Sequence, residues 1–320
     1  MHDASAASPR IGFIGTGLIG TPMVERMLET GLGVMVWNRT IAKAEPLAAL
    51  GAVLAESARA LAEQCDIVCL CLTDTKAVEA LMFGDDGTDS GMASVIRAGH
   101  TVVDFSSIAP DATVRMAEKL RAERGAAWVD APVSGGLPAA RAGKLIVFAG
   151  GEASDIARAA PVFNALAMRV THMGSQGAGQ FAKSCNQMIV ACNLMVIGEM
   201  LAFAQSAGIE MSRMPGALAG GFADSLPLQI FGHRMARHVD TPRIGALATF
   251  KKDIDQVARL AAERGAYVPM TSRAVELYAE AMAHVDVGVD ADSSRLIRLF
   301  EAMRHDSSAA SESAAAGDAL

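Results

Sequence analysis

The sequence has few aromatic residues and fewer basic residues than acidic ones. Phe, Trp and Tyr make up 5% of the 320 residues, and 28 Lys and Arg stand against 35 Asp and Glu, for a net charge of −7. No basic run offers a patch that could follow a phosphate backbone, so we expect no nucleic-acid partner. The length favours two domains, and a hydrophobic content of 51% suits a soluble globular protein with a sizeable core.

Cysteine pairs and clustered histidines are lacking too. None of the five cysteines belongs to a CxxC pair, and the seven histidines have no metal-ligand spacing. The sequence therefore predicts reduced structural thiols in a cytoplasmic protein, and no metal site.

Segments typical of secretion or membrane insertion are scarce. Residues 1–9 lack the basic start and apolar core of a signal peptide. The one candidate span, residues 188–204, carries Asn193 and Glu199, and its uncharged run is shorter than the ~20 apolar residues that a span needs. We expect no membrane partner and a buried helix between domains at this position.

The first half of the chain alternates short apolar runs with helical patterns. Runs of strand length occur at 10–14, 34–37, 67–72, 101–105, 128–129 and 145–149. Helical patterns separate them at 21–30, 42–50, 76–82 and 111–124. Continuous apolar runs are typical of buried parallel strands. The alternation predicts a doubly wound parallel α/β sheet with helices on both faces.

The second half reads as helix only. After about His172 the helical patterns are at 180–207, 213–220, 227–237, 250–264 and 269–283. We therefore predict a Rossmann domain over residues 10–174 and an all-helical domain over 175–305, joined by the long helix 180–207. The Gly-rich segment 174–179 marks the boundary, and the ends 1–9 and 306–320 are predicted to be disordered.

A glycine fingerprint follows the first predicted strand and precedes the first predicted helix. Gly15 permits a tight turn, Gly17 lets a pyrophosphate approach the backbone, and Gly20 lets the helix pack on the strand. The helix N-terminus then offers N–H groups to the phosphate. The fingerprint predicts dinucleotide binding by Gly15, Thr16, Gly17, Leu18 and Ile19.

The end of the second predicted strand indicates which dinucleotide. Asn38, Arg39 and Thr40 stand where an NAD-binding protein has an acidic residue for the ribose hydroxyl. No carboxylate repels a 2′-phosphate there, and the Arg39 guanidinium can pair with one. Lys43, one helical turn later, can assist. We predict NADP(H) in preference to NAD(H), against the alternative that Arg39 is a solvated loop charge.

Two further segments carry candidate chemistry. Residues 130–136 follow a strand, so they lie at the carboxyl edge of the sheet, and Ser134, Gly135 and Gly136 offer a hydroxyl and backbone N–H groups to an anion. Lys183 stands just before the uncharged run 184–198. Burial can make such a lysine an acid or base near neutral pH, whereas on an exposed helix it would only cover apolar surface with its stem.

These segments together resemble the β-hydroxyacid dehydrogenase family, which includes 3-hydroxyisobutyrate dehydrogenase and tartronate semialdehyde reductase. The resemblance runs from Ile11 to Met303 and rests on motifs that occur in the family's order: residues 12–23, 130–136, 177–187 and 251–253. Residues 104–110 are similar to the family's loop beside the nicotinamide.

The resemblance implies roles for individual residues. Lys183 would be the catalytic acid/base, and Ser134, Gly135 and Gly136 would hold the substrate carboxylate. Asn186 or Gln187 would bond the substrate oxygen, although many relatives carry Asn where this chain has Gln187. The remaining implied roles are cofactor contacts by Leu72, Ser107 and Lys252, and organisation of a closed cleft by Asp253. The long helix would support a homodimer or homotetramer with a 6-phosphogluconate dehydrogenase-like C-terminal domain.

The function implied is an NADP(H)-dependent oxidoreductase that interconverts a small 3-hydroxyacid and its semialdehyde. The candidate substrates are 3-hydroxyisobutyrate, tartronate semialdehyde, and succinic semialdehyde or glyoxylate. Two alternatives remain: an imine reductase of the same fold and a non-catalytic NADP-binding interaction module. Lys183 argues against both, because imine reductases often carry Asp or Tyr in its place and non-catalytic relatives lose it.

Overall fold

The computed structural model describes residues 9–84, 90–284, 286–288 and 291–303, so nearly all of the two predicted disordered ends lies outside the described residues. The chain divides into two compact units, Met1–Lys183 and Ser184–Leu320. The division falls after the predicted boundary at 174–179, because the first turns of the long helix α9 (Ala178–Ser206) belong to the first unit.

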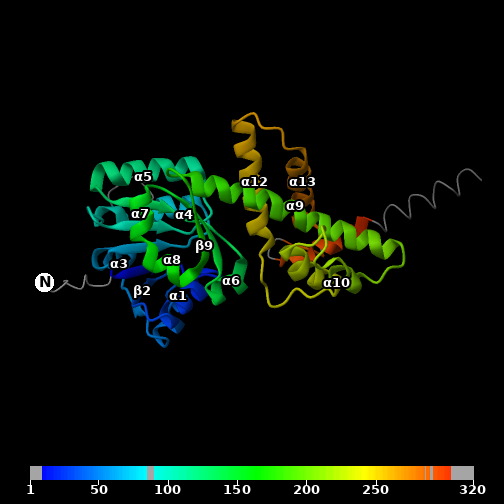
Figure 1. The fold of residues 1–320 in the computed structure, drawn as a ribbon, viewed down its shortest axis with the longest axis horizontal. Coiled ribbons are helices and arrows are strands. Elements are labelled where there is room, and N and C mark those ends of the chain that lie inside the picture. Colours follow the sequence, from blue (N-terminus) through cyan, green and yellow to red (C-terminus); the bar gives the residue numbers. More distant parts are fainter. Residues whose placement is uncertain (1–8, 85–89, 285, 289–290, 304–320) are drawn as a thin grey trace, which may run out of the picture. The chain divides into compact units, whose positions relative to one another are not determined.

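The described part of the first unit contains one nine-stranded sheet in the order β3-β2-β1-β4-β5-β6-β8-β7, with β9 paired to β8 (Figure 1). Strands β1 to β6 pair in parallel, in the order that dinucleotide-binding folds share. The strands are β1 (Ile11–Ile14), β2 (Val34–Trp37), β3 (Val53–Leu54), β4 (Ile67–Leu70), β5 (Thr101–Asp104), β6 (Ala127–Asp130), β7 (Val133–Ser134), β8 (Leu145–Gly150) and β9 (Ala167–Gly174).

Helices pack on both faces of this sheet, as the sequence predicts. Successive side chains of a strand point to opposite faces, so Phe13 of β1 lies in one apolar cluster and Ile14 in the other. The first cluster includes residues of α1, α6 and α8, and the second includes residues of α3, α4 and α5. The helices of this unit are α1 (Gly20–Glu29), α2 (Glu45–Ala48), α3 (Ala58–Gln64), α4 (Thr75–Phe83), α5 (Pro110–Arg124), α6 (Gly136–Ala142), α7 (Ala153–Arg158) and α8 (Ala160–Leu166).

The predicted parallel sheet is confirmed for β1 to β6, whereas the strands beyond β6 extend it as a mixed sheet. Strand β8 runs antiparallel to β6 and β7, and β9 runs parallel to β8. The helix between β7 and β8, α6, has 7 residues. Helix α3 also has 7 residues and joins two parallel strands, β3 and β4, so helix length alone does not set the direction of β8. Strand β9 was not predicted, because it is an edge strand whose side chains are mostly exposed and show no apolar alternation.

The described part of the second unit contains helices and no strand, in line with the prediction of an all-helical region. Its core gathers residues of α9, α12 and α13 around the buried Tyr278. Helix α13 has the predicted bounds, whereas the predicted helix 227–237 consists of a π-helical turn, η4 (Leu228–Gly232), followed by α11 (His233–Ala236). The remaining α-helices of this unit are α10 (Met214–Leu218) and α12 (Leu247–Glu263), and α13 spans Pro269–Ala283.

Helix α9 is long and apolar enough to cross a membrane by length and composition, and 50% of its most apolar window is buried inside the protein. The core helix of a soluble protein has the same properties, so α9 alone is weak support for a span.

Candidate active site

The Gly-rich loop between β1 and α1 is shaped by close backbone contacts. Gly15 has φ +102°, and a side chain there would overlap the carbonyl oxygen of Cys71. A side chain at Gly20 would overlap the carbonyl oxygen of Gly15, so the third glycine lets α1 start directly on the turn. A Cβ at Gly17 would meet no atom of the described residues within 4 Å. The middle glycine therefore leaves its side of the loop open, as the approach of a pyrophosphate requires.

An amide side chain joins this loop to the end of β2. The backbone N–H of Thr16 donates to Asn38 Oδ1 (3.1 Å), and Asn38 Nδ2 donates to the carbonyl of Thr40 (2.8 Å). Thr16 is 2% exposed, and its hydroxyl finds no hydrogen-bond partner within the described residues. A buried hydroxyl without a partner beside an open glycine loop fits a dinucleotide phosphate.

The two cations predicted to bind the 2′-phosphate follow Asn38 in the sequence, just after the end of β2. Arg39 and Lys43 are exposed, and neither has an ion pair among the residues described. On the other side of the loop, the Leu72 side chain would touch a Cβ built at Gly15, at 3.0 Å. The structure thus gathers the predicted cofactor residues from Gly15 to Leu72 at the carboxyl edge of β1, β2 and β4.

The segment that follows β5 is held by hydrogen bonds from three directions. Leu72 N–H donates to Ser106 Oγ (2.9 Å), and Ala109 N–H donates to Thr75 Oγ1 (3.0 Å). From α9, Gln180 Nε2 donates to the Ser106 carbonyl (2.7 Å), while Gln180 Oε1 accepts from Ile108 N–H (3.1 Å). Ser107, the predicted cofactor contact, therefore lies between two backbone groups that one side chain fixes.

A buried carboxylate at the end of β6 holds the start of α9. Asp130 Oδ1 accepts from Gly177 N–H (2.9 Å), and Asp130 Oδ2 accepts from Gln180 N–H (3.0 Å). Burial raises the pKa of the Asp130 carboxyl above its usual value, although these N–H groups act in the opposite direction. A side chain at Gly179 would overlap the Phe148 carbonyl oxygen and lie 2.8 Å from Asp130 Oδ2. Only glycine at 179 lets the helix start so close to the carboxylate.

Lys183 lies one turn further along α9 and is 9% exposed. It therefore differs from a lysine that covers apolar surface with its stem and keeps its ammonium group in water. In the same unit, Ser134 is half-buried at the end of β7, paired in register with Ile146 of β8. Gly135 (φ +122°) and Gly136 (φ +64°) turn the chain from β7 into α6 in conformations that favour glycine. Their roles in holding a substrate carboxylate stay predictions.

In the second unit, the predicted site residues form one hydrogen-bonded group. Asn186 Nδ2 donates to Gln187 Oε1 (2.9 Å), and Gln187 Nε2 donates to Asp253 Oδ2 (2.6 Å). Lys252 Nζ lies 3.1 Å from Asp253 Oδ1. The buried carboxylate of Asp253 thus orients both Gln187 and Lys252. The predicted contacts of this group with substrate and cofactor remain predictions.

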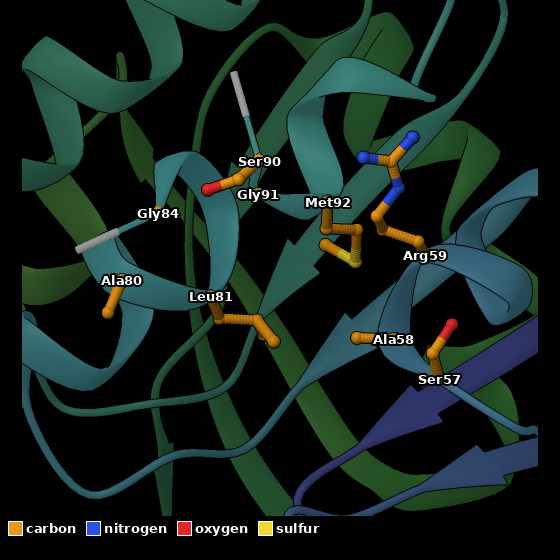
Figure 2. Close-up of a pocket in the computed structure, with 9 residues that line it drawn as sticks. All are labelled: Ser57, Ala58, Arg59, Ala80, Leu81, Gly84, Ser90, Gly91 and Met92. Atoms are coloured by element: carbon orange, nitrogen blue, oxygen red, sulfur yellow. The ribbon is translucent and has the colours of Figure 1, made fainter. Parts of the chain in front are cut away.

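A pocket elsewhere in the first unit involves none of these residues. Its volume is about 310 Å³, and Figure 2 shows it between the start of α3 and the end of α4. Arg59 and Ser90 supply polar groups, while Leu81 and Met92 supply an apolar wall. The lining contains no residue that the sequence associates with dinucleotide or substrate. Among the described residues, no cluster of His, Cys, Asp and Glu suits a metal ion.

The sequence does not indicate that Asp130 and Gln180 hold neighbouring segments together. It marks Asn38 as a cofactor residue, but not as the link between the glycine loop and the end of β2. Asp130 and Gln180 both lie inside motifs that were singled out. What marks them is a contact between segments 47 and 74 residues apart, and no local pattern encodes such a contact.

Comparisons with known proteins agree with this arrangement. A family model described as the NAD binding domain of 6-phosphogluconate dehydrogenase matches residues 10–174. A second, described as NAD-binding of NADP-dependent 3-hydroxyisobutyrate dehydrogenase, matches residues 177–300. The chain is 37% identical to 2-hydroxy-3-oxopropionate reductase of Escherichia coli (strain K12), over 92% of this chain and 98% of that protein.

Two further likenesses point the same way. The chain is 32% identical to a probable 3-hydroxyisobutyrate dehydrogenase-like protein of Arabidopsis thaliana, over 92% of this chain and 86% of the relative. The crystal structure of 3-hydroxyisobutyrate dehydrogenase from Salmonella typhimurium has a TM-score of 0.83 and 26% identity, covering 92% of this chain and 100% of that one. With a glycine loop that fits a dinucleotide, the chain belongs to the β-hydroxyacid dehydrogenase family and is an NAD(P)-dependent dehydrogenase of the 3-hydroxyacid type.

Proposed function

We propose that the protein interconverts a small 3-hydroxyacid and its semialdehyde, with Lys183 as the general acid and base. The observation that carries this proposal is the burial of Lys183 on the helix whose start Asp130 and Gln180 tie to the carboxyl edge of the sheet. In open α/β sheets that edge is where ligands bind.

The chain's own residues supply proton transfer and orientation. The nicotinamide cofactor, when bound, supplies or accepts the hydride. As an ammonium, Lys183 stabilises the negative charge that grows on the carbonyl oxygen during reduction and donates a proton to that oxygen. In the oxidation direction, neutral Lys183 takes the proton of the hydroxyl group. Ser134, Gly135 and Gly136 hold the substrate carboxylate, so that binding energy fixes the reacting carbon in place.

NADP(H) is the preferred cofactor under this proposal. Arg39 and Lys43 are exposed cations that follow Asn38 in the sequence, and Asn38, which bonds to the glycine loop, stands where a carboxylate would repel a 2′-phosphate. A planar guanidinium pairs with phosphate through two parallel hydrogen bonds. Comparison of the Michaelis constants for NADPH and NADH tests this, and a clear preference for NADH would contradict it.

The first substrate to test is tartronate semialdehyde, because 2-hydroxy-3-oxopropionate is the compound named for the Escherichia coli relative. The other compounds of the substrate panel are the semialdehyde formed by oxidation of 3-hydroxyisobutyrate, succinic semialdehyde and glyoxylate. We further propose that the protein is cytoplasmic and that it forms a homodimer or homotetramer; sedimentation of the purified protein measures the oligomeric state directly.

The decisive experiment is this panel, assayed with both cofactors for the wild type and for Lys183→Ala. We expect kcat to fall by about 10²–10⁴-fold, because that is the usual contribution of a positioned acid or base. Lys119→Ala is the matched control: Lys119 is exposed on α5, where its ammonium lies 4.4 Å from the centre of the Phe83 ring. Near-normal turnover in a folded Lys183→Ala protein would contradict the role of Lys183 as general acid and base. Reduction of cyclic imines without reduction of any semialdehyde would favour the imine reductase alternative.

A further inference from the structure

The segment after β5 has little regular structure, yet its backbone is fixed at two points around Ser107. The carbonyl of Ser106 and the N–H of Ile108 both bond to the side-chain amide of Gln180. One group accepts and the other donates, so the side chain that joins them must offer a donor and an acceptor together. A glutamine amide does both, whereas an ionised glutamate only accepts and a methionine lacks an N–H donor.

Gln180 itself is held rigidly. Its backbone N–H donates to Asp130, and the residue is 1% exposed. Water therefore has little access to the side-chain amide of Gln180, and reaching it would require the helix start or the loop to move. Side chains three residues apart in a helix lie on nearly the same face, so the next residue on the Gln180 side of α9 is Lys183.

We propose that Gln180 is a positioning residue: it fixes the distance between the loop at Ser107 and the helical turn that carries Lys183. This inference rests on the proposed function, in which Ser107 contacts the cofactor and Lys183 transfers the proton. The hydride and the proton reach two bonded atoms of the same substrate, so a fixed separation between their sources is what the reaction requires. Misplacement of a reacting group by about 1 Å can cost on the order of 10²-fold in rate.

The test compares three variants of the full-length protein. Gln180→Met keeps the side-chain length and removes both bonds, and we expect kcat to fall about 10–100-fold while the dissociation constant of NADPH changes less than about 3-fold. Gln180→Glu is expected to lose kcat at pH 8 and to recover part of it at pH 6. A buried, protonated glutamate regains a donor for Ser106 and keeps an acceptor for Ile108. The control is Gln64→Met, because Gln64 Nε2 donates to the Ala60 carbonyl (3.1 Å) on the exposed surface of α3.

Two readouts on cofactor-free protein separate this inference from the proposed function. Hydrogen exchange of the Ile108 amide should accelerate at least about 10-fold in Gln180→Met, while that of the Cys71 amide, bonded to the Ile14 carbonyl in the sheet, stays unchanged. The rate of Lys183 acetylation, relative to that of Lys119, should also change. If the wild type turns over nothing in the panel, the proposed function fails, and these two rates still decide whether Gln180 couples the loop to the lysine.

Specific outcomes would overturn the inference. One is unchanged Ile108 exchange and unchanged Lys183 acetylation in Gln180→Met. Another is a kcat within about 2-fold of the wild type when the wild type is active. A third is a Gln180→Glu variant that loses the same fraction of activity at pH 6 and pH 8.

Discussion

The two edges of the sheet in the first unit are stabilised in different ways. At the carboxyl edge, the side chains of Asn38, Ser106 and Gln180 bond to backbone groups of neighbouring loops, and most of these contacts are buried or half-buried. At the amino edge, Arg10 and Asp66 form an ion pair whose side chains are 60% and 42% exposed. His100, just before β5, is buried there without a hydrogen-bond partner for its ring within the described residues.

The difference shows what a ligand-binding edge demands. A buried hydrogen bond between a side chain and a backbone group fixes one geometry, and breaking it leaves a costly unpaired group. An exposed ion pair is screened by water and tolerates several geometries, so it contributes little. The loops at the carboxyl edge, where the proposed reacting groups lie, are fixed by the first kind of contact, whereas the opposite edge has no such need. Substitutions at the two edges should therefore differ in size.

The largest effect is expected at the carboxyl edge for Gly179→Ala. The new methyl group would overlap the Phe148 carbonyl and crowd Asp130, so α9 could start only after a backbone shift. We expect a loss of about 3 kcal/mol in the free energy of unfolding, at the upper end of overpacking effects. Denaturant titration measures it. Gly33→Ala is the control, because a Cβ there meets nothing within 4 Å in the part of the chain that the structure describes. Equal stability of the two variants would show that the carboxyl edge is less rigid than described.

A smaller effect is expected from His100. Burial, followed by the nearby Arg97, lowers the pKa of His100 below its usual value, while Asp66 acts in the opposite direction and Arg10 lowers it further. The folded state therefore binds a proton less readily than the unfolded chain, and stability should be full above about pH 6.5 and decline as pH falls below it.

The measurement is the difference in unfolding midpoint between the wild type and His100→Asn from pH 7.5 to 5. The wild type should lose about 1–2 °C more than the variant over this range. Parallel curves would mean that His100 does not contribute to the pH dependence of the amino edge.

The smallest effect is expected from Arg10→Ala. Hydrogen bonds from Arg10 hold the pKa of Asp66 below its usual value, yet both side chains are largely in water. We expect the unfolding midpoint to move by about 1 °C or less, and less still at high salt. A shift as large as that of Gly179→Ala would contradict the contrast between the edges.

Much of this architecture could be predicted from the sequence because local signals encode it. The continuous apolar runs gave β1, β2, β4 and β5, Gly15 to Gly20 gave the cofactor loop, and residues 269–283 were predicted as the helix observed there. Strand β9 escaped prediction because its side chains face solvent and lack a period of two. The direction of β8 escaped because an apolar run such as 145–149 does not indicate which way its strand runs relative to its neighbours.

The residues of the candidate site likewise fall into those that local sequence signals reveal and those that only the tertiary fold brings together. Lys183, Ser134 and the glycines are visible because particular residue types occupy particular spacings. The functions of Asp130 and Gln180 in holding the edge are not, because their partners are set by the tertiary fold. Their neighbours in sequence give no indication that these side chains would meet backbone groups of other segments.

The hydrogen bonds between Asp130 and the start of α9 have a consequence for how the protein folds. The carboxylate and the Gly177 amide that it binds are 47 residues apart, and the intervening chain forms β7, β8 and β9 with their helices. A first helical turn is costly to nucleate, and closing a long loop costs further entropy. The Asp130 contribution to that turn becomes available only once these strands have joined the sheet. We therefore expect the lysine-bearing end of α9 to be among the last parts of the first unit to become ordered, so that Lys183, the proposed proton donor, is set in place only after the sheet is complete.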